Sequence, residues 1–281
     1  MSKIVSYSEV FKKQTCDRQY YYRFVLGRRP IVESGAIDTG IKGHKLMQIF
    51  NECIAANNSK DEALAIVRKK AKEIAEVSAT PDFNLLTALT LVENYVQTTE
   101  FNIDALFIEK RFLLPASKLS DDPFFEDVMI GFTPDVVFQR TGNFLDVEDF
   151  KFVQRAWTKK KIDRFPQCKL YQVFLEAMGF KVSFSRIRFF NTKTGVVTFQ
   201  NYTIKDAERK ILIRDFMHGV KETIQYREQS AEVLAQSPRT MNYTTCAGCY
   251  FNFPCTLEGE GKNVTRILET EFEKSEYDYN V

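Results

Sequence analysis

The residue pattern with the clearest chemistry is an acid and a base two positions apart, Asp149 and Lys151, in residues 145–151 (LDVEDFK). Because side chains alternate along a strand, these two groups would share one face while Phe150 points to the opposite face and a core. Asp-x-Lys is common by chance, so an ordinary polar surface is the favoured interpretation of this run alone.

A second acid can be placed beside this pair. Residues 127–139 (DVMIGFTPDVVFQ) form an extended run that contains Asp135, and residues 141–143 (TGN) after it are typical of a hairpin turn. If the two runs pair, Asp135 lies next to Asp149 and Lys151. Two carboxylates and an ammonium are the minimum set for holding a Mg²⁺-class cation, a phosphate and an attacking water together.

Three thiols form a second candidate site near the C-terminus: Cys246, Cys249 and Cys255. Closed zinc and four-iron sites typically take four protein ligands, and Cys16 is the natural fourth. Such a site would join chain segments 246 − 16 = 230 residues apart, and would stabilise the fold by about 5 kcal/mol on a loop-closure estimate. Its loss should loosen the whole domain. The cysteine spacing alone favours an iron–sulfur cluster and a zinc site about equally, and three free thiols in a loop are a weaker alternative.

One of the two histidines, His44, falls in the first turns of a helix predicted from Gly40 through Ile54. A lone helical histidine is usually a surface or satisfied core residue, so it counts as a ligand only if other ligands appear.

A local basic patch directly follows the acid–lysine run. Residues 154–169 hold six basic residues against Asp163 alone, giving 6 − 1 = +5. The basic residues are Arg155, Lys159, Lys160, Lys161, Arg164 and Lys169. With Trp157 inside the patch, a groove that holds single-stranded nucleic acid is favoured over a solvated charge run with a packed tryptophan.

Composition limits the class of protein. A chain of 281 residues with 44% hydrophobic residues can bury a sizeable core, and a net charge of +2 gives no global electrostatic argument for nucleic-acid binding. No apolar run reaches membrane-spanning length, and the N-terminus lacks the apolar core of a signal peptide. We expect a cytoplasmic protein with no membrane contact (host cytoplasm for a viral protein), in which cysteines serve as ligands or buried thiols.

The order of the predicted elements indicates an α/β fold, a mixed sheet flanked by helices. Helical patterns are followed by extended runs, a helix, further extended runs and a long helix. The predicted helices cover residues 60–77, 84–98, 162–180 and 205–236, and the predicted extended runs cover 105–114, 181–190 and 195–202 in addition to the hairpin.

Taken together, these residues resemble the RecB-like, iron–sulfur branch of the PD-(D/E)XK nucleases, which includes the CRISPR-associated adaptation exonucleases and the AddB nuclease domain. The matching pieces occur in the family's order. They are the first-cysteine segment at Cys16, the histidine motif at Gly40 to His44, Gly131 to Asp135 for Gly-x-x-Asp with one extra residue, Asp149-Phe150-Lys151, Gln167 to Tyr171 for Gln-x-x-x-Tyr, and the C-terminal cysteine triplet.

The resemblance implies a role for each residue. His44, Asp135, Asp149 and the carbonyl of Phe150 would bind Mg²⁺ or Mn²⁺, and Lys151 would position the water. Glu148 is the second choice as a ligand. The catalytic set also includes Gln167 and Tyr171, which would contact the substrate or the catalytic residues, and the four cysteines would hold a 4Fe-4S cluster that joins the N- and C-terminal segments.

The resemblance also predicts the domain organisation. Residues 1–268 would form one RecB-like nuclease domain followed by an acidic tail, residues 269–281. Within the domain, residues 1–103 would be mostly helical, 104–204 would be the catalytic sheet core, and 205–268 would carry the C-terminal helix and cysteines.

The predicted function is a metal-dependent DNA exonuclease acting on single strands or free ends, in recombination, replication, repair or CRISPR-type adaptation. The chain has no Walker-type phosphate loop, so a helicase motor would be a separate partner chain, as would any recombination or CRISPR partner. The alternatives are a non-catalytic DNA-binding or end-processing scaffold with an iron–sulfur or zinc structural site, and a redox-sensing cluster protein.

Overall fold

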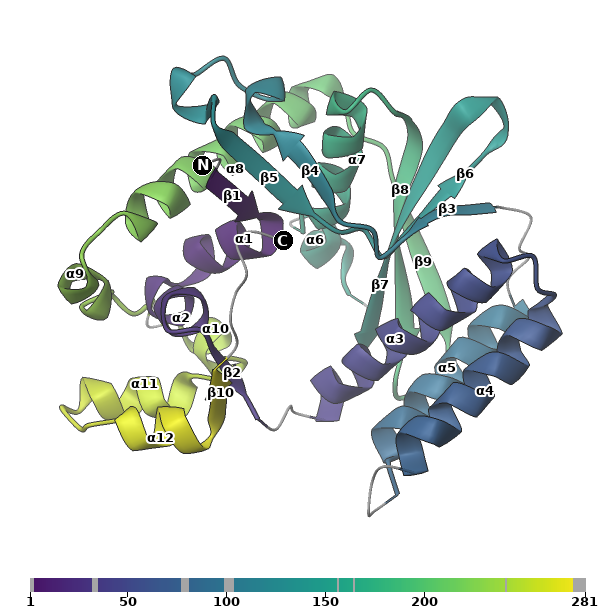
Figure 1. Ribbon diagram of the computed structural model, residues 1–281, viewed down its shortest axis with the longest axis horizontal. Helices are drawn as coiled ribbons and strands as arrows, with labels where there is room; N and C mark the ends of the chain where they lie inside the picture. The colour runs from purple at the N-terminus through teal and green to yellow at the C-terminus, as the bar shows by residue number, and fades with distance from the viewer. Residues whose placement is uncertain are drawn as a thin grey trace. The chain divides into compact units, whose positions relative to one another are not determined.

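A computed structural model describes residues 3–31, 35–76, 81–98, 104–155, 157–163, 165–240 and 242–274. The chain divides into two compact units (Figure 1). The first unit comprises Met1–Glu33, Leu113–Gly131 and Ile211–Val281, and the second comprises Ser34–Phe112 and Phe132–Lys210. Within these described ranges no helix is both long and apolar enough to cross a membrane.

The second unit is built on a mixed sheet whose strands lie in the order β3-β6-β7-β8-β9 (Figure 1). The strands are β3 (Asp104–Ile108), β6 (Val136–Gln139), β7 (Phe144–Val153), β8 (Lys181–Asn191) and β9 (Val197–Tyr202). β7 and β8 are parallel, and the other neighbours are antiparallel. The α/β class with a mixed sheet that the sequence predicts is therefore confirmed.

Helices cover both faces of this sheet. On one face lie α3 (Gly35–Ala55), α4 (Lys60–Glu76) and α5 (Phe83–Thr98), side by side in Figure 1, and their apolar side chains form one core with Phe150 and Phe190. On the other face, α6 (Lys159–Asp163) and α7 (Gln167–Ala177) form the crossover between the parallel strands and pack Ile162 and Cys168 against Ile187 and Phe189. Adjacent residues of β8 thus face opposite layers, as strand alternation requires.

α3 passes very close to the sheet at Gly43. A Cβ atom at this position would lie 2.3 Å from the Phe152 ring, and that ring is stacked on Phe190 with centroids 4.5 Å apart. Only glycine allows this approach. The approach places the next residue, His44, beside β7.

A buried ion cluster fixes the pairing of β7 with β8. Glu148 is 1% exposed, and its carboxylate accepts hydrogen bonds from Arg188 at 2.6 and 3.1 Å and from Arg186 at 2.7 Å. The Arg188 guanidinium also lies 4.5 Å from the centroid of Tyr95 on α5. These contacts occupy the Glu148 carboxylate on the side of β7 opposite Asp149.

Several predicted elements are shorter than expected. The run 127–139 is wrong as one strand, because it forms β5 (Val128–Phe132) and β6 in two different sheets. Pro134 lies at the break, and it has no N–H to continue a ladder. The run 105–114 likewise splits into β3 and β4 (Phe112–Pro115) at Glu109, whose φ of 46° is left-handed.

The two predicted long helices also divide. The helix 162–180 becomes α6 and α7, which are separated by a segment containing Pro166. The helix 205–236 becomes α8 (Asp206–Arg227) and α9 (Ala231–Ala235), because the hydroxyl of Ser230 caps a new helix by accepting from the Val233 N–H. The turn 141–143 does connect β6 to β7, as a short 3₁₀ turn η4 (Thr141–Asn143) with Gly142 at φ 77°.

The first unit contains a three-stranded sheet, β1-β5-β4, in which β1 (Lys3–Ser6) runs parallel to β5. Its N-terminal helical part is α1 (Tyr7–Thr15), α2 (Asp17–Tyr20) and the π-helix η1 (Tyr21–Val25), and its short 3₁₀ turns are η2 (Ala116–Lys118) and η3 (Pro123–Phe125). The C-terminal helices are α10 (Tyr243–Ala247), α11 (Asn252–Gly259) and α12 (Thr265–Thr270).

The N- and C-terminal segments of this unit are joined by ordinary packing and hydrogen bonds. β2 (Arg28–Pro30) pairs with β10 (Phe272–Lys274), and Tyr22 packs in one core with Phe251 and Phe272. Regular structure therefore continues through residue 274, beyond the predicted start of the tail at 269. The single-domain boundary at residue 268 stays a prediction, and residues 275–281 lie outside the described part of the chain.

Removing Glu148 should strongly destabilise the second unit. We expect Glu148→Ala to lower the free energy of unfolding by about 3–5 kcal/mol, because it leaves two arginines without their buried counter-charge. Glu93→Ala is the matched control: it breaks the exposed 2.6 Å pair with Arg68 and should cost at most about 1 kcal/mol. Urea denaturation of both variants measures the difference. Equal effects would contradict the assignment of Glu148 to the register of the sheet.

Candidate functional site

Four of the predicted catalytic residues meet at one place in the second unit. His44 of α3 approaches Asp135, which lies just before β6, with Nδ1 and Oδ2 3.5 Å apart. The Phe150 N–H of β7 donates to the same Asp135 oxygen at 2.5 Å. Next along β7, the Lys151 ammonium contacts an Asp149 carboxylate oxygen at 2.5 Å. Asp149 and Lys151 thus share a face, and Phe150 enters the core between them, as the alternation predicts.

A fifth residue, Glu109, was not singled out from the sequence. One of its carboxylate oxygens lies 4.0 Å from His44 Nδ1, and its backbone N–H donates to the carbonyl of Asp135 at 3.0 Å. Among the described residues, His44, Glu109 and Asp135 bring their ligand atoms within 4.8 Å of one another. The signal available in the sequence was the charged triplet Glu109-Lys110-Arg111, which interrupts an apolar run.

Asp149 is a buried carboxylate with few interaction partners for its oxygens. It is 0% exposed, and apart from its ion pair with Lys151 its oxygens accept no hydrogen bond from the described residues. Burial, with a further contribution from the charge of Asp135, raises the pKa of Asp149 to about 6, although Lys151 opposes the shift. A buried acid with open coordination positions is suited to a bound cation.

The neighbouring groups respond to the same local charges. Burial and the charge of Asp135 raise the pKa of Glu109 to about 7. Burial alone would lower the pKa of His44 and of Lys151, but the nearby carboxylates raise both above their ordinary values. The pKa of Asp135 is lowered despite burial, because His44, Lys151 and the Phe150 N–H favour its ionised form. Three of these donors, His44, Glu109 and Asp135, lie close enough together to share a divalent cation, and Asp149 lies outside this group of three.

α7 closes the other side of the site. The side chain of Gln167 donates a 2.8 Å hydrogen bond to the Tyr171 hydroxyl, so the predicted pair on one helical face does form a contact. Tyr171 is 4% exposed, and burial together with the nearby charge of Asp149 raises its pKa well above the ordinary value. Glu148, the second-choice ligand, is held instead by its two arginines on the opposite side of β7.

The predicted DNA-contact residues follow β7 on the same unit. Arg155, Lys159 and Lys160 are exposed. Trp157 is half-buried, packs its ring edge-to-face on Phe165 at 4.8 Å and carries the Lys161 ammonium 4.2 Å above its centroid. Arg164 lies outside the described residues.

Phe165 connects this patch with the catalytic face. Its ring centroid lies 5.5 Å from the Lys151 ammonium, and Trp157 contacts the same ring. The basic patch is therefore continuous with Lys151, the predicted catalytic lysine, through two aromatic rings.

The four predicted cysteine ligands line one small cavity of about 30 Å³ in the first unit. The other lining residues are Gln19, Tyr22, Arg239, Thr240, Thr245, Phe251 and Asn252. Among the described residues no three cysteine sulfurs lie within 4.8 Å of one another, so the thiols do not form a compact tetrahedral cluster. Tetrahedral zinc, with Zn–S of about 2.3 Å, requires sulfurs about 3.8 Å apart.

The thiols of this cavity differ in their readiness to ionise. Cys16 lies at the N-terminus of α2. Burial would raise its pKa, but hydrogen bonds from the Thr240 hydroxyl and from the backbone N–H groups of Gln19, Thr240 and Arg18 lower it. For Cys249 and Cys255 burial prevails and the pKa is raised. Four thiols that line one cavity, one of them with a pKa below its ordinary value, fit a thiolate-ligated inorganic group.

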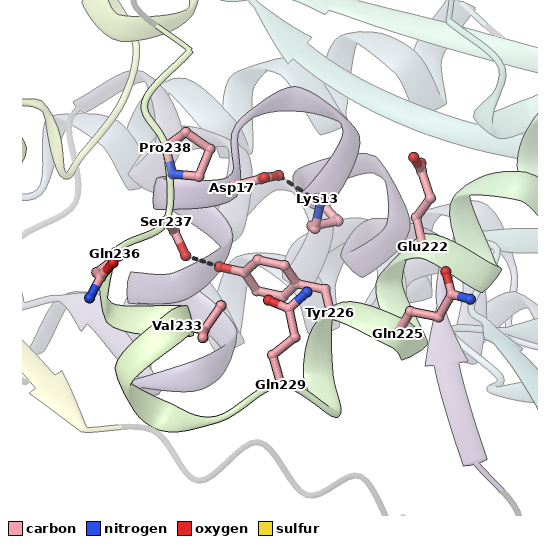
Figure 2. A pocket seen from close by; sticks show the side chains of 10 residues that line it. All are labelled: Lys13, Asp17, Glu222, Gln225, Tyr226, Gln229, Val233, Gln236, Ser237 and Pro238. Atoms are coloured by element: carbon pink, nitrogen blue, oxygen red, sulfur yellow. Dashed lines mark hydrogen bonds and ion pairs between the residues drawn. The ribbon is translucent and has the colours of Figure 1, made fainter.

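A second and larger cavity of the first unit, of about 470 Å³, is lined by residues of α1, α2, α8 and α9 and of the segments that follow α8 and α9 (Figure 2). Figure 2 shows Tyr226 at its centre, hydrogen-bonded to Ser237, and the Lys13–Asp17 ion pair at 2.7 Å. Its charged lining residues are Lys13, Asp17 and Glu222, and none of the predicted site residues lines it. We assign it no catalytic role.

Comparisons with known proteins identify the family and the fold. The family model described as the PD-(D/E)XK nuclease superfamily matches residues 4–256. Among solved structures, a protein from Eubacterium rectale described as a "putative exonuclease" is 12% identical over 88% of both chains, with a TM-score of 0.55. At this sequence identity, the match supports a shared fold and does not support a shared function.

A further solved structure, that of SSO0001, is 13% identical, covers 91% of this chain and 86% of its own, and has a TM-score of 0.42, which is too low to carry an argument. A search of curated proteins finds no match. The family model spans nearly the whole chain and includes every predicted catalytic residue and cysteine. The chain therefore belongs to the PD-(D/E)XK nuclease superfamily.

Proposed function

We propose that this nuclease is a Mg²⁺- or Mn²⁺-dependent DNA exonuclease that hydrolyses phosphodiester bonds of single strands or free ends. The observation that supports the proposal best is the convergence of His44, Asp135, Asp149 and Lys151, two acids, an imidazole and an amine from three separate elements, in one place. A structural ion pair would not need a third and fourth ionisable group, nor an acid as poorly solvated as Asp149.

The residues that would hold the cation are Asp135, Asp149, His44 and the carbonyl of Phe150. We add Glu109 to this proposed set, because its ligand atom lies within 4.8 Å of those of His44 and Asp135. A divalent cation supplies charge stabilisation at the scissile phosphate and a lower pKa for a bound water. The left-handed backbone at Glu109 supports its inclusion, because strained residues collect at functional sites.

The other residues act on water and phosphate directly. Lys151 stays protonated, since the two carboxylates raise its pKa, and its ammonium can donate hydrogen bonds to the attacking water or to a non-bridging phosphate oxygen. Gln167 orients the Tyr171 hydroxyl by donating to it. Phe165 covers the ammonium from the side of the basic patch and limits its access to bulk water.

The substrate contacts in this proposal come from the basic patch. Exposed Arg155, Lys159 and Lys160 would bind the phosphate backbone, Trp157 and Lys161 would contact it at the aromatic end, and Arg164 stays a prediction. Non-specific backbone contacts suit an enzyme that degrades DNA from an end. A helicase, recombination or CRISPR partner and a cytoplasmic location stay predictions from the sequence.

We further propose that Cys16, Cys246, Cys249 and Cys255 hold a 4Fe-4S cluster. Among the described residues no three cysteine sulfurs lie within 4.8 Å of one another, which suits a four-iron cluster better than a single zinc ion, because each cysteine of such a cluster binds a different iron. When bound, the cluster cross-links the N- and C-terminal segments of the first unit. Since β2, β10 and the aromatic core already join these segments, the cluster would reinforce an existing contact.

Substitutions at β7 test the catalytic assignment. We expect Lys151→Ala and Asp149→Asn each to lower Mn²⁺-dependent degradation of end-labelled single-stranded DNA at least about 100-fold, because each removes a group that acts on the transition state. Lys72→Ala, which changes a 78% exposed lysine of α4, is the control and should leave the rate unchanged. Full activity in both β7 variants would refute the assignment, and DNA binding without cleavage by the wild type would favour the scaffold alternative.

The raised pKa of Asp149 predicts that this acid, when ionised, lowers the stability of the metal-free protein. The fold favours the neutral form of Asp149, so protonation of this carboxyl group stabilises the folded protein. This stabilisation is fully present below pH 3.8, the ordinary pKa of the group, and is lost as the pH rises through about 6, its pKa in the folded protein. Asp149→Asn removes the buried charge and should increase the free energy of unfolding at pH 8 by on the order of 2 kcal/mol.

Denaturation in the presence of chelator at pH 8, 7, 6 and 5 measures this effect. The gain should shrink as the pH falls through 6, and the exposed Asp61→Asn should show no such trend. A pH-independent or destabilising effect of Asp149→Asn would contradict the proposed environment.

Metal analysis tests the cysteine assignment. The protein purified without oxygen should be brown and contain about four iron atoms per chain, and its colour should fade when a reductant is added. Cys249→Ser should lose the iron, whereas Cys53→Ser in the second unit should keep it. A colourless protein that contains zinc would show that the cluster assignment is wrong.

A further inference from the structure

Arg239 has an unusual position beside the cysteine cavity. It lines the cavity, and its guanidinium lies directly against the backbone of α11, the helix that carries Cys255. A Cβ atom at Gly259 would lie 1.9 Å from Arg239 Nη1 and 2.6 Å from Cζ. The absence of a side chain at Gly259 therefore creates the position that the guanidinium occupies.

The positive charge of Arg239 is only partly compensated. Its nearest acid is Glu258, with Nη2 and Oε2 3.9 Å apart. The same Glu258 oxygen already accepts a 2.6 Å hydrogen bond from the Tyr22 hydroxyl and forms an ion pair with Arg18. Two guanidinium groups thus share one carboxylate at the edge of the cavity.

Arg18 makes several further contacts in addition to its ion pair with Glu258. It donates to the carbonyl of Ala235, and its guanidinium lies about 5 Å from the ring centroids of Tyr21 and Tyr22. Among the described residues that line this cavity, Arg239 is the cation, and its charge favours the thiolate form of Cys255. Lys12, which does not line the cavity, favours the thiolate form of Cys249.

A nearby cation would stabilise a four-iron cluster held by four thiolates. A core of charge +2 with four thiolates carries a net charge of −2, and burying it in a cavity lined mainly by thiols and aromatic rings is unfavourable unless a positive group lies close by. Groups around a metal site, beyond its ligands, tune its affinity and its potential.

We propose that Arg239, seated against Gly259, is the charge-compensating residue of the iron–sulfur group and sets its reduction potential. The inference rests on the proposed cluster. It concerns a positioning residue that contacts no substrate, so its test uses the cluster itself rather than nuclease activity.

Two substitutions on different elements test the inference in the full-length, cluster-loaded protein. Arg239→Gln removes the charge, and Gly259→Ala displaces it by placing a methyl group where the guanidinium lies. In both variants the midpoint potential of a one-electron dithionite titration should become more negative, because the added electron loses a nearby positive charge. Iron affinity, measured by competition with a chelator, should fall roughly 10-fold.

Two further variants control the experiment. Arg239→Lys keeps a positive charge and should retain most of the wild-type potential. Arg266→Gln removes an exposed cation of α12 and should change nothing. Circular dichroism confirms that each variant is folded, and alanine is favourable in the helix that Gly259 ends.

The outcomes separate this inference from the cluster assignment. Wild-type protein without iron would overturn both. A brown Arg239→Gln protein with the wild-type potential and wild-type iron affinity would overturn only the role of Arg239. A negative shift in Arg239→Gln and Gly259→Ala, reversed in Arg239→Lys, would support it.

Discussion

The candidate active site depends on holding two carboxylates and an ammonium together in a largely buried position. Asp149 is fully buried and Asp135 nearly so, and each raises the free energy of ionising the other. Lys151 offsets this repulsion only in part. The surrounding fold holds these groups in place despite their repulsion. The β7–β8 ladder with its Glu148 cluster fixes the position of Asp149 along the strand. The close approach of α3 at Gly43 fixes the position of His44. A divalent cation is the group that would satisfy these oxygens.

Much of this site could be predicted from local rules. Strand alternation correctly placed Asp149 and Lys151 on one face and Phe150 in the core, and the Thr-Gly-Asn turn correctly joined β6 to β7. The mixed sheet followed from the alternation of helical and extended runs. Glu109 was missed because it appeared to continue a strand, and only the three-dimensional return of the chain beside Asp135 brings it to the site. Periodicity cannot reveal such a contact.

The elements that were wrong share one cause. Apolar periodicity continues through short breaks, so it cannot show where a ladder or helix ends. Pro134 and the left-handed Glu109 interrupt strands, and the cap at Ser230 begins a new helix, so the predicted runs are distributed among different sheets and helices. The cysteines show the opposite case: spacing alone predicted that residues near both ends of the chain meet, and they line one cavity. The loop-closure estimate for a cross-link between them is an upper bound, because real unfolded chains are not ideally flexible.

Direct binding of Mn²⁺ to the DNA-free protein tests the central claim, that the fold presents a cation site before substrate arrives. Electron paramagnetic resonance counts free and bound Mn²⁺ without relying on turnover. The account predicts saturable binding by the wild type and binding weakened at least about 10-fold in Asp135→Asn and Glu109→Gln. Equal Mn²⁺ binding by the wild type and Asp135→Asn would contradict it.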